Sequence, residues 1–388
     1  MRRLLRNGAV AFLAIGMAGW GVAGCGSSQA TRPAAAEESR ESPTEVSRGS
    51  GVMLSPGLLE HAGLKSVWEQ TLPLKQGEKF VAVTLLGNRL YVRSDQNYLW
   101  SLDRATGEMA FNRSIAPPGI PVLGLTPYEN TLISVIGNEL VELDVASGKK
   151  QRVTDLNLSI VAPPVRNGEF FYVGAADRRL HVFRAKDLVR IFPVTADDDS
   201  LVTTVVADDN TVAFGTDAGD LVGMMPDAPK KLWSFKVPQA VAGPVMRDGN
   251  SFYFASTDTN VYRVDVADGG KAALMWKYQA EAILDRPPLV TRDFVYQYAV
   301  GRGLTAIAKQ TGKAAWSLPE GVDLLAEAGT RAYVITWDRT LAVMDNAAGR
   351  RLFTANFGPV TDHAANTMDA RIYVMDSTGR VACLEPIP

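Results

Sequence analysis

A short strand motif recurs eight times along the chain, and this repeat restricts the possible folds more than any other feature. Successive copies begin 37 to 43 residues apart, and a second strand motif, eight to ten residues upstream, repeats in step. A fixed period near 40 residues built from short strands is typical of a propeller with one four-stranded blade per repeat. We therefore predict an all-β fold, an eight-bladed β-propeller of four-stranded antiparallel blades. The copies are LWSLD at Leu99, LVELD at Leu140, LHVFR at Leu180, LVGMM at Leu221, VYRVD at Val261, LTAIA at Leu304, LAVMD at Leu341 and VACLE at Val381.

Each repeat is expected to hold an inner strand, the two aligned strands, and an outer strand with an aromatic residue. The aromatic is Phe111 in the first copy, whereas the second copy has Arg152 there. Five copies place glycine between the third and fourth strands, where tight turns demand a positive φ. The third copy (Ala185–Asp187) and the fourth (Pro226–Pro229) lack it and are predicted to be more irregular. Inner strands are expected to begin near Phe80, Ile120, Ile160, Leu201, Ala240, Pro287, Val322 and His363.

The eighth copy has no outer strand after its third strand, Val381–Glu385. An unassigned strand pattern lies near the other end of the propeller, at Lys65–Leu72, and its Trp68 matches the aromatic of the outer strands. We predict that this segment completes the last blade, which would leave the ring without an open sheet edge. A short helical turn that begins at Pro56 and stops at Gly63 is expected just before it.

The N-terminus has the layout of an export signal, with a basic head and an apolar run from about Ala9 to Ala23. The run is short and glycine-rich for a membrane-spanning helix. It ends in Val-Ala-Gly-Cys, which resembles the lipobox of bacterial lipoproteins. That resemblance implies a signal peptide at residues 1–24 and acylation of Cys25, the expected lipidation site. An ordinary cleaved signal, an uncleaved anchor and a twin-arginine signal at Arg2-Arg3 are the alternatives.

Residues 25–54 are rich in Ser, Ala, Glu, Arg and Pro, a composition that predicts a disordered tether. The propeller is assigned to residues 55–388. Gly26 differs from the Asp that retains enterobacterial lipoproteins in the inner membrane, so the resemblance implies an outer-membrane location on the periplasmic side. The net charge of the chain is −2 and no basic face is evident, which argues against nucleic-acid binding.

The strand–LD–x–x–TG–x–x–x–W units resemble the repeats of the pyrroloquinoline-quinone-like propeller superfamily over about residues 65–388. Within it, a lipobox, a tether and eight repeats resemble the BamB family, lipoprotein scaffolds of the outer-membrane β-barrel assembly machinery. The resemblance implies a non-enzymatic, monomeric scaffold that binds a β-barrel assembly component through loops on one face. Thr195–Leu201 and Ala280–Arg286 are the positionally equivalent segments. Neither reproduces the family's loop sequence, so no partner-binding residue is assigned.

Quinone-dependent dehydrogenases of the same superfamily are an alternative. By resemblance, they hold the quinone between a Trp and a vicinal disulfide and bind calcium. This chain has only Cys25 and Cys383, and Cys383 occupies a strand position that holds Ser101 in the first copy. We therefore expect no enzymatic activity and no cofactor. A periplasmic propeller that binds a ligand or polymer is the other alternative.

Few other residues suggest a metal-binding or partner-binding role. His61, His181 and His363 lack metal-ligand spacing, so we expect no metal site. The acidic runs 197–199 and 208–209 lack the calcium-loop pattern and are interpreted as solvated loops. The aromatic segments 296–298 (Tyr-Gln-Tyr, interpreted as exposed) and 336–339 (Thr-Trp-Asp-Arg) are candidates for a binding surface, although packing between blades is the alternative for each.

Overall fold

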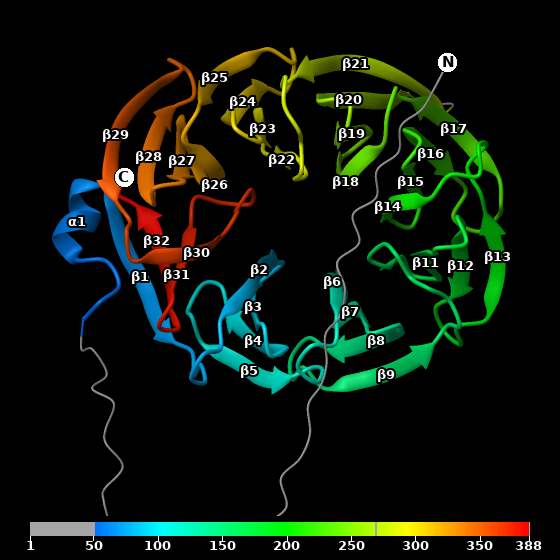
Figure 1. The fold of residues 1–388 in the computed structure, drawn as a ribbon, viewed down its shortest axis with the longest axis horizontal. Helices are drawn as coiled ribbons and strands as arrows, with labels where there is room; N and C mark the ends of the chain where they lie inside the picture. The colour runs from blue at the N-terminus through cyan, green and yellow to red at the C-terminus, as the bar shows by residue number, and fades with distance from the viewer. Residues whose placement is uncertain (1–50, 268–269, 388) are drawn as a thin grey trace, which may run out of the picture. The chain divides into compact units, whose positions relative to one another are not determined.

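A computed structural model describes residues 51–267 and 270–387, and these residues form one compact unit of eight four-stranded sheets. The sheets are arranged around a ring, as Figure 1 shows, so the predicted eight-bladed propeller is confirmed. Seven blades are made of four consecutive strands. Blade 1 is β2 (Phe80–Leu86), β3 (Arg89–Ser94), β4 (Tyr98–Asp103) and β5 (Met109–Ser114); blade 2 is β6 (Val122–Tyr128), β7 (Thr131–Ile136), β8 (Glu139–Asp144) and β9 (Lys150–Asp155); blade 3 is β10 (Val165–Arg166), β11 (Phe170–Gly174), β12 (Leu180–Arg184) and β13 (Arg190–Val194).

The second half of the ring repeats this order from inner to outer strand. Blade 4 is β14 (Val202–Ala207), β15 (Val212–Thr216), β16 (Asp220–Met224) and β17 (Lys231–Lys236); blade 5 is β18 (Val241–Asp248), β19 (Ser251–Ser256), β20 (Asn260–Ala267) and β21 (Lys271–Gln279). Blade 6 is β22 (Leu289–Val290), β23 (Phe294–Ala299), β24 (Gly303–Ala308) and β25 (Ala314–Leu318); blade 7 is β26 (Gly321–Ala328), β27 (Arg331–Thr336), β28 (Thr340–Asp345) and β29 (Arg350–Asn356).

Blade 8 joins strands from the two ends of the propeller. Its inner three strands are β30 (Val360–Ala364), β31 (Ile372–Asp376) and β32 (Arg380–Pro386), and its outer strand is β1 (Leu64–Thr71). β1 runs antiparallel to β32 with Trp68 opposite Cys383, and the two strands lie side by side in Figure 1. The closure predicted from Trp68 is therefore confirmed. The helical turn before it is α1 (Pro56–His61), capped by the side chain of Ser55.

Two inner strands are short, and that of the third copy begins at Val165, after the predicted start near Ile160. β10 and β22 have two residues each, and each directly follows a pair of prolines, at 163–164 and 287–288. Proline has no backbone N–H to contribute to a sheet, so pairing begins only after it. Upstream of β10, Ile160 keeps a single bridge to Ala175.

The core lies between neighbouring blades and is fixed by the outer-strand aromatic residues. Trp276 stands opposite Arg263 in the sheet, and its indole donates to the carbonyl of Lys309 in the next blade at 2.9 Å. The turn glycine of that next blade, Gly312, lies against the indole, where an added Cβ would be 2.6 Å from the ring. Gly148 lies against Phe111 in the same way. The glycines thus allow each turn to pack on the preceding blade, in addition to permitting a positive φ.

One predicted irregular turn is regular. In the third copy, Leu188 takes the glycine position with φ +55°, and its N–H donates to the carbonyl of Arg184 at 2.8 Å, as Gly107 does to Asp103. The prediction was wrong because the hydrogen bonds and the packing of Leu188 hold a backbone conformation that leucine disfavours. The fourth turn does differ: it keeps the bond from the N–H of Met225 to the carbonyl of Lys230, but Pro229 takes the glycine position and has no N–H to donate.

The second copy replaces the aromatic contact with charged groups. Arg152 stands opposite Glu142 in the sheet and forms an ion pair with it. Arg152 also donates to the carbonyl of Ala185 at 2.8 Å and lies over the ring of Phe171 in blade 3. A guanidinium can thus bridge two blades at the position that an aromatic ring occupies elsewhere.

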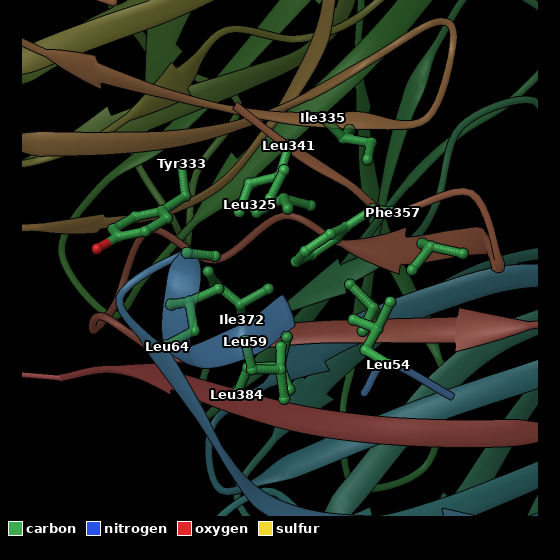
Figure 2. Close-up of a cluster of buried hydrophobic side chains, with 14 of the residues drawn as sticks. Leu54, Leu59, Leu64, Leu325, Tyr333, Ile335, Leu341, Phe357, Ile372 and Leu384 are labelled. Carbon is green, nitrogen blue, oxygen red and sulfur yellow. The ribbon is translucent and has the colours of Figure 1, made fainter. Parts of the chain in front are cut away.

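α1 is packed into the ring at the closure. Leu59 and Leu64, from the N-terminal segment, belong to one buried cluster with Leu325 of blade 7 and Leu384 of β32, as Figure 2 shows. No helix in the described part of the chain is long and apolar enough to span a membrane. The predicted signal peptide, Cys25 and most of the predicted tether lie outside the described residues.

Candidate partner-binding face

The loops of the ring lie on two faces because consecutive antiparallel strands end at opposite edges. The connection between two blades lies beside the turn between the second and third strands of the following blade. Backbone hydrogen bonds join them: the N–H of Val300 donates to Ile283, and that of Trp337 donates to Glu320, both at 3.0 Å. We call this side the interblade-loop face, and the side with the other turns the hairpin face.

The interblade-loop face carries the two most exposed large apolar residues among the described positions. Trp337, in the β27–β28 turn, is 73% exposed, and Ile283, in the connection from β21 to β22, is 68% exposed. Val300, hydrogen-bonded beside Ile283, is 44% exposed. Exposed aromatic and branched side chains on a rigid surface are typical of interface residues. We refer to Ile283, Val300 and Trp337 as the apolar loop residues.

The predicted loop Ala280–Arg286 is held firmly at its end. Gln297 is buried and donates to the carbonyl of Arg286 at 3.0 Å. The guanidinium of Arg286 lies 4.5 Å from the ring centre of Tyr298 and donates to the carbonyl of Val322 at 3.2 Å. This loop is therefore anchored to blades 6 and 7 while Ile283 points to solvent.

These contacts correct the interpretation of segment 296–298 as exposed. Tyr296 and Gln297 are both buried. The hydroxyl of Tyr296 donates to Glu327 and accepts from Asn346 at 2.8 Å, so it joins blades 6 and 7 on the hairpin face. The segment supports a candidate loop and is not itself a binding surface. Trp337, by contrast, is exposed, as a binding role requires.

A cavity of about 750 Å³ on the hairpin face and a smaller one of about 490 Å³ on the interblade-loop face are among the larger hollows. The second lies beside Val300 and is lined in part by Tyr278, Ala299 and Pro319. Glu281 and Arg302, at its edge, form an exposed ion pair at 3.5 Å. The hollow thus places a mixed polar and apolar lining next to the exposed side chains of Ile283 and Val300.

The other predicted loop, Thr195–Leu201, has a different character. Its carboxylates contact lysines of the adjacent outer strand: Asp197 pairs with Lys231, and Asp198 with Lys236 at 3.0 Å. The nearby Ser200 hydroxyl and the Lys236 ammonium lower the pKa of Asp198 to about 2. The run 197–199 is therefore a charged and largely neutralised loop.

The second acidic run has a structural role. Asp208 pairs with Arg247 of blade 5, and Asp209 accepts the backbone N–H of Gly168 in blade 3 at 3.0 Å. Both carboxylates therefore connect neighbouring blades.

The three histidines lie on different elements: α1, β12 of blade 3 and β30 of blade 8. His181 pairs with Asp177 at 2.9 Å, and His363 pairs with Asp323 at 3.0 Å. Within residues 51–267 and 270–387, no three His, Cys, Asp or Glu side chains are grouped so as to hold a metal ion.

Cys383 is a buried strand residue. It lies opposite Trp68 in the closing sheet and is fully buried. Burial raises the pKa of its thiol to about 11, which keeps the sulfur protonated and unreactive at neutral pH. Its environment is therefore unlike that of a nucleophilic cysteine.

The sequence analysis identified the loop Ala280–Arg286 but did not single out Ile283 within it. The signal was present, because this isoleucine lies in a connection that also contains Glu281, Asp285 and Arg286. The neighbouring Leu284 of the same connection is buried, however, so the composition of the loop does not decide which side chain is exposed. The exposure of Ile283 depends on the geometry of the connection, which the sequence alone does not provide.

The repeats and their closure define the class of protein: an eight-bladed propeller of the pyrroloquinoline-quinone-like type. A family model described as "Outer membrane protein assembly factor BamB" matches residues 119–270, 194–292 and 229–350, which together span more than half of the chain. The chain therefore belongs to this BamB family. No curated protein sequence matches it significantly.

Solved structures with the same fold are diverse. BamB from Moraxella catarrhalis superposes with a TM-score of 0.63 at 16% identity, covering 83% of this chain and 97% of that one. The computationally designed protein Ika8 gives a TM-score of 0.61 at 16% identity, with coverage of 81% and 98%. The C-terminal WD40 domain of Sif2 gives 0.59 at 12% identity, with coverage of 83% and 98%. At these identities the likeness shows the fold alone.

Proposed function

We propose that this chain is a lipid-anchored, non-enzymatic scaffold that binds a protein component of outer-membrane β-barrel assembly. The observation that carries the proposal is the exposure of Ile283, Val300 and Trp337 on the interblade-loop face of a BamB-family propeller. A scaffold works by holding a surface in a fixed geometry. Here, hydrogen bonds and packing contacts hold neighbouring blades together at each gap described above. Recognition therefore needs no conformational change in the ring.

The charges around the apolar loop residues suit a protein partner. Glu281 and Arg302 lie at the rim of the adjacent hollow, and Asp338 and Arg339 follow Trp337. Both signs of charge are present, so the rim can accept complementary groups without favouring a polyanion. An apolar centre with a mixed polar rim is the usual composition of a protein-binding surface.

The membrane anchor forms the second half of the proposal. We assign residues 1–24 as the signal peptide, Cys25 as the acylated residue, 25–54 as the tether and 55–388 as the propeller at the periplasmic side of the outer membrane. The last two tether residues, Met53 and Leu54, are buried in the core of the propeller. The family match and the lipobox support this assignment. Changing Cys25 to Ser is expected to move the protein from the membrane fraction to the soluble one and to remove the acyl mass from the N-terminal peptide. If the protein remains in the membrane fraction, the anchor is not at Cys25.

Site-specific photocrosslinking in cells tests the partner. A photoreactive phenylalanine analogue is placed at 283, at 337, or at the control position 232, an exposed leucine on outer strand β17. We expect crosslinks to the barrel-forming subunit of the assembly machinery from positions 283 and 337 and none from 232. Crosslinks that contain no β-barrel assembly component would refute the role. Recovery of a different periplasmic partner at 283 and 337 would instead support a propeller with another target.

A further inference from the structure

The gap between blades 7 and 8, where the ring closes, differs in structure from the other gaps between blades. In blades 1 to 7 the third strand continues through a turn into the fourth, and this turn lies on the hairpin face. In blade 8, β32 ends at Pro386, and the outer strand β1 arrives from α1 instead. The gap between blades 7 and 8 therefore has no such turn over it.

In three other gaps, a residue that closely follows the third strand contacts the hydroxyl of a buried tyrosine of the preceding blade. The hydroxyl of Tyr373 donates to the carbonyl of Arg104 at 3.0 Å, and that of Tyr172 donates to the carbonyl of Pro226 at 3.0 Å. Asn346 donates to the hydroxyl of Tyr296 at 2.8 Å. These three contacts are alike because the repeat places both residues at equivalent positions.

Tyr333 is the equivalent tyrosine of blade 7, and its hydroxyl has no contact of this kind. Its side chain is fully buried, and its hydroxyl has no hydrogen bond of normal geometry within the described residues, although the Arg331 side chain is close enough to interact with it. Burial raises the pKa of this hydroxyl and the nearby Arg331 guanidinium moderates the rise, so the hydroxyl stays protonated and can donate. Figure 2 shows the hydroxyl pointing away from the apolar cluster, and the residue lines the cavity of about 750 Å³. A buried donor without a partner is costly in a folded protein.

Two guanidinium groups also line this cavity, those of Arg331 and Arg371. Two carboxylates line it as well, but each already has a cation: Asp369 pairs with Arg104 at 2.8 Å and Glu385 with Lys65 at 2.9 Å. Neither Arg331 nor Arg371 has an ion-pair partner within the part of the chain that the structure describes. The cavity therefore holds an uncompensated positive charge beside an unpaired hydroxyl.

We propose that this cavity at the closure binds a carboxylate-bearing ligand with an apolar portion. The carboxylate lies between Arg331 and Arg371 and accepts a hydrogen bond from Tyr333. Guanidinium groups match the planar carboxylate geometry, and a buried hydroxyl aimed at the anion adds a charge-assisted bond. The apolar portion packs against Ala328 and Ile387, which line the same cavity. The site lies on the hairpin face, and the proposal is independent of the scaffold function.

The test compares two probes that differ only in charge, N-acetyl-leucine and N-acetyl-leucine amide. Binding to the full chain is measured by NMR titration. For a ligand of this size we expect a dissociation constant for the acid of about 1 mM. We expect binding of the amide to be weaker by about tenfold or more, because it cannot form ion pairs. Equal binding of acid and amide, or no saturable binding of the acid near this concentration, would overturn the proposal.

Three variants identify the site and separate binding from folding. Tyr333→Phe removes only the hydroxyl, so we expect affinity for the acid to fall about tenfold while the melting temperature stays equal or rises. Arg371→Gln is expected to weaken the acid similarly and to leave the amide unchanged. The matched control is Tyr296→Phe, which loses two hydrogen bonds: it should lower the melting temperature and leave affinity unaltered. Unchanged affinity in Tyr333→Phe and Arg371→Gln would place the ligand elsewhere and contradict the proposal.

Discussion

Gly312 offers a direct measure of how strongly each turn depends on its contact with the preceding blade. Its φ is +69°, and an added Cβ would lie 2.6 to 2.7 Å from Trp276, including the Cβ of that residue. A rotation of the indole cannot relieve the overlap, because the tryptophan Cβ is fixed to the backbone. Gly312→Ala therefore combines two costs: about 1–2 kcal/mol for alanine at a positive φ and about 1–3 kcal/mol for overpacking.

Gly329→Ala is the matched control. Gly329 lies in the β26–β27 turn with φ +59°, and no atom lies within 4 Å of the position its Cβ would take. This variant should show the backbone cost alone, about 1–2 kcal/mol. The difference between the two variants therefore isolates the contact with Trp276.

Guanidinium chloride unfolding provides the measurement, followed by circular dichroism and by tryptophan fluorescence. The two signals must give coincident transitions for the free energies to be compared. We expect Gly312→Ala to be less stable than Gly329→Ala by about 1–3 kcal/mol. If the two variants lose the same free energy of unfolding, the close approach of turn and ring contributes nothing beyond permitting the positive φ, and our account of the glycines is refuted.

Three further perturbations have expected outcomes. Thr259 is β-branched and has φ +70°, so Thr259→Gly should raise the free energy of unfolding by about 1 kcal/mol in the same assay; a loss would show that its side chain stabilises the turn. Cys383 should resist iodoacetamide at pH 8 in the native protein and react in urea, because burial keeps its thiol protonated; rapid native labelling would contradict this. The lowered pKa of Asp198 means that its pairing with Lys236 stabilises the fold above its unfolded pKa of about 3.9 and is lost as the pH falls toward 2. Lys236→Gln should therefore flatten the decline in stability between these pH values, and an unchanged slope would show that the pair is not stabilising.

The strand register could be predicted because it follows from the spacing between residues in the sequence. Ser101 and Phe111 are ten residues apart, as are Val343 and Phe353, and the structure places each pair opposite one another. The same regularity identified Trp68 as the missing outer residue. Spacing constrains which residues face each other across a hairpin, and eight copies make the pattern unambiguous.

Exposure within the middle strands could not be predicted in the same way. Tyr296 and Gln297 are adjacent and therefore point to opposite faces of their blade, yet both are buried. Each blade is covered on both faces by its neighbours, so the alternation of buried and exposed residues that marks an open sheet is lost. The prediction of an irregular turn at Leu188 was wrong for a related reason, because contacts outside the turn determine its backbone conformation.

The candidate sites could be predicted even less well than exposure within the strands, because they depend on contacts that form only in the assembled ring. The sequence shows that the eighth copy lacks an outer strand, but it does not show that the hydroxyl of Tyr333 is left without a partner. That property depends on which side chains surround the hydroxyl in the assembled ring. Likewise, the loop that carries Ile283 is positioned by Gln297 and Arg286, contacts that have no periodic signature.

The pairing of β1 with β32 also has a consequence for biogenesis. Leu64 meets Pro386 across this sheet, so the contact that completes the ring joins residues that are synthesised more than 300 positions apart. Until both have emerged, the partly made ring has two open strand edges, which are prone to pair with other chains. Long-range pairing of this kind is slow to form. We therefore expect the newly made chain to depend on protection from aggregation until its last strand is available, and the finished ring to unfold slowly once it has closed.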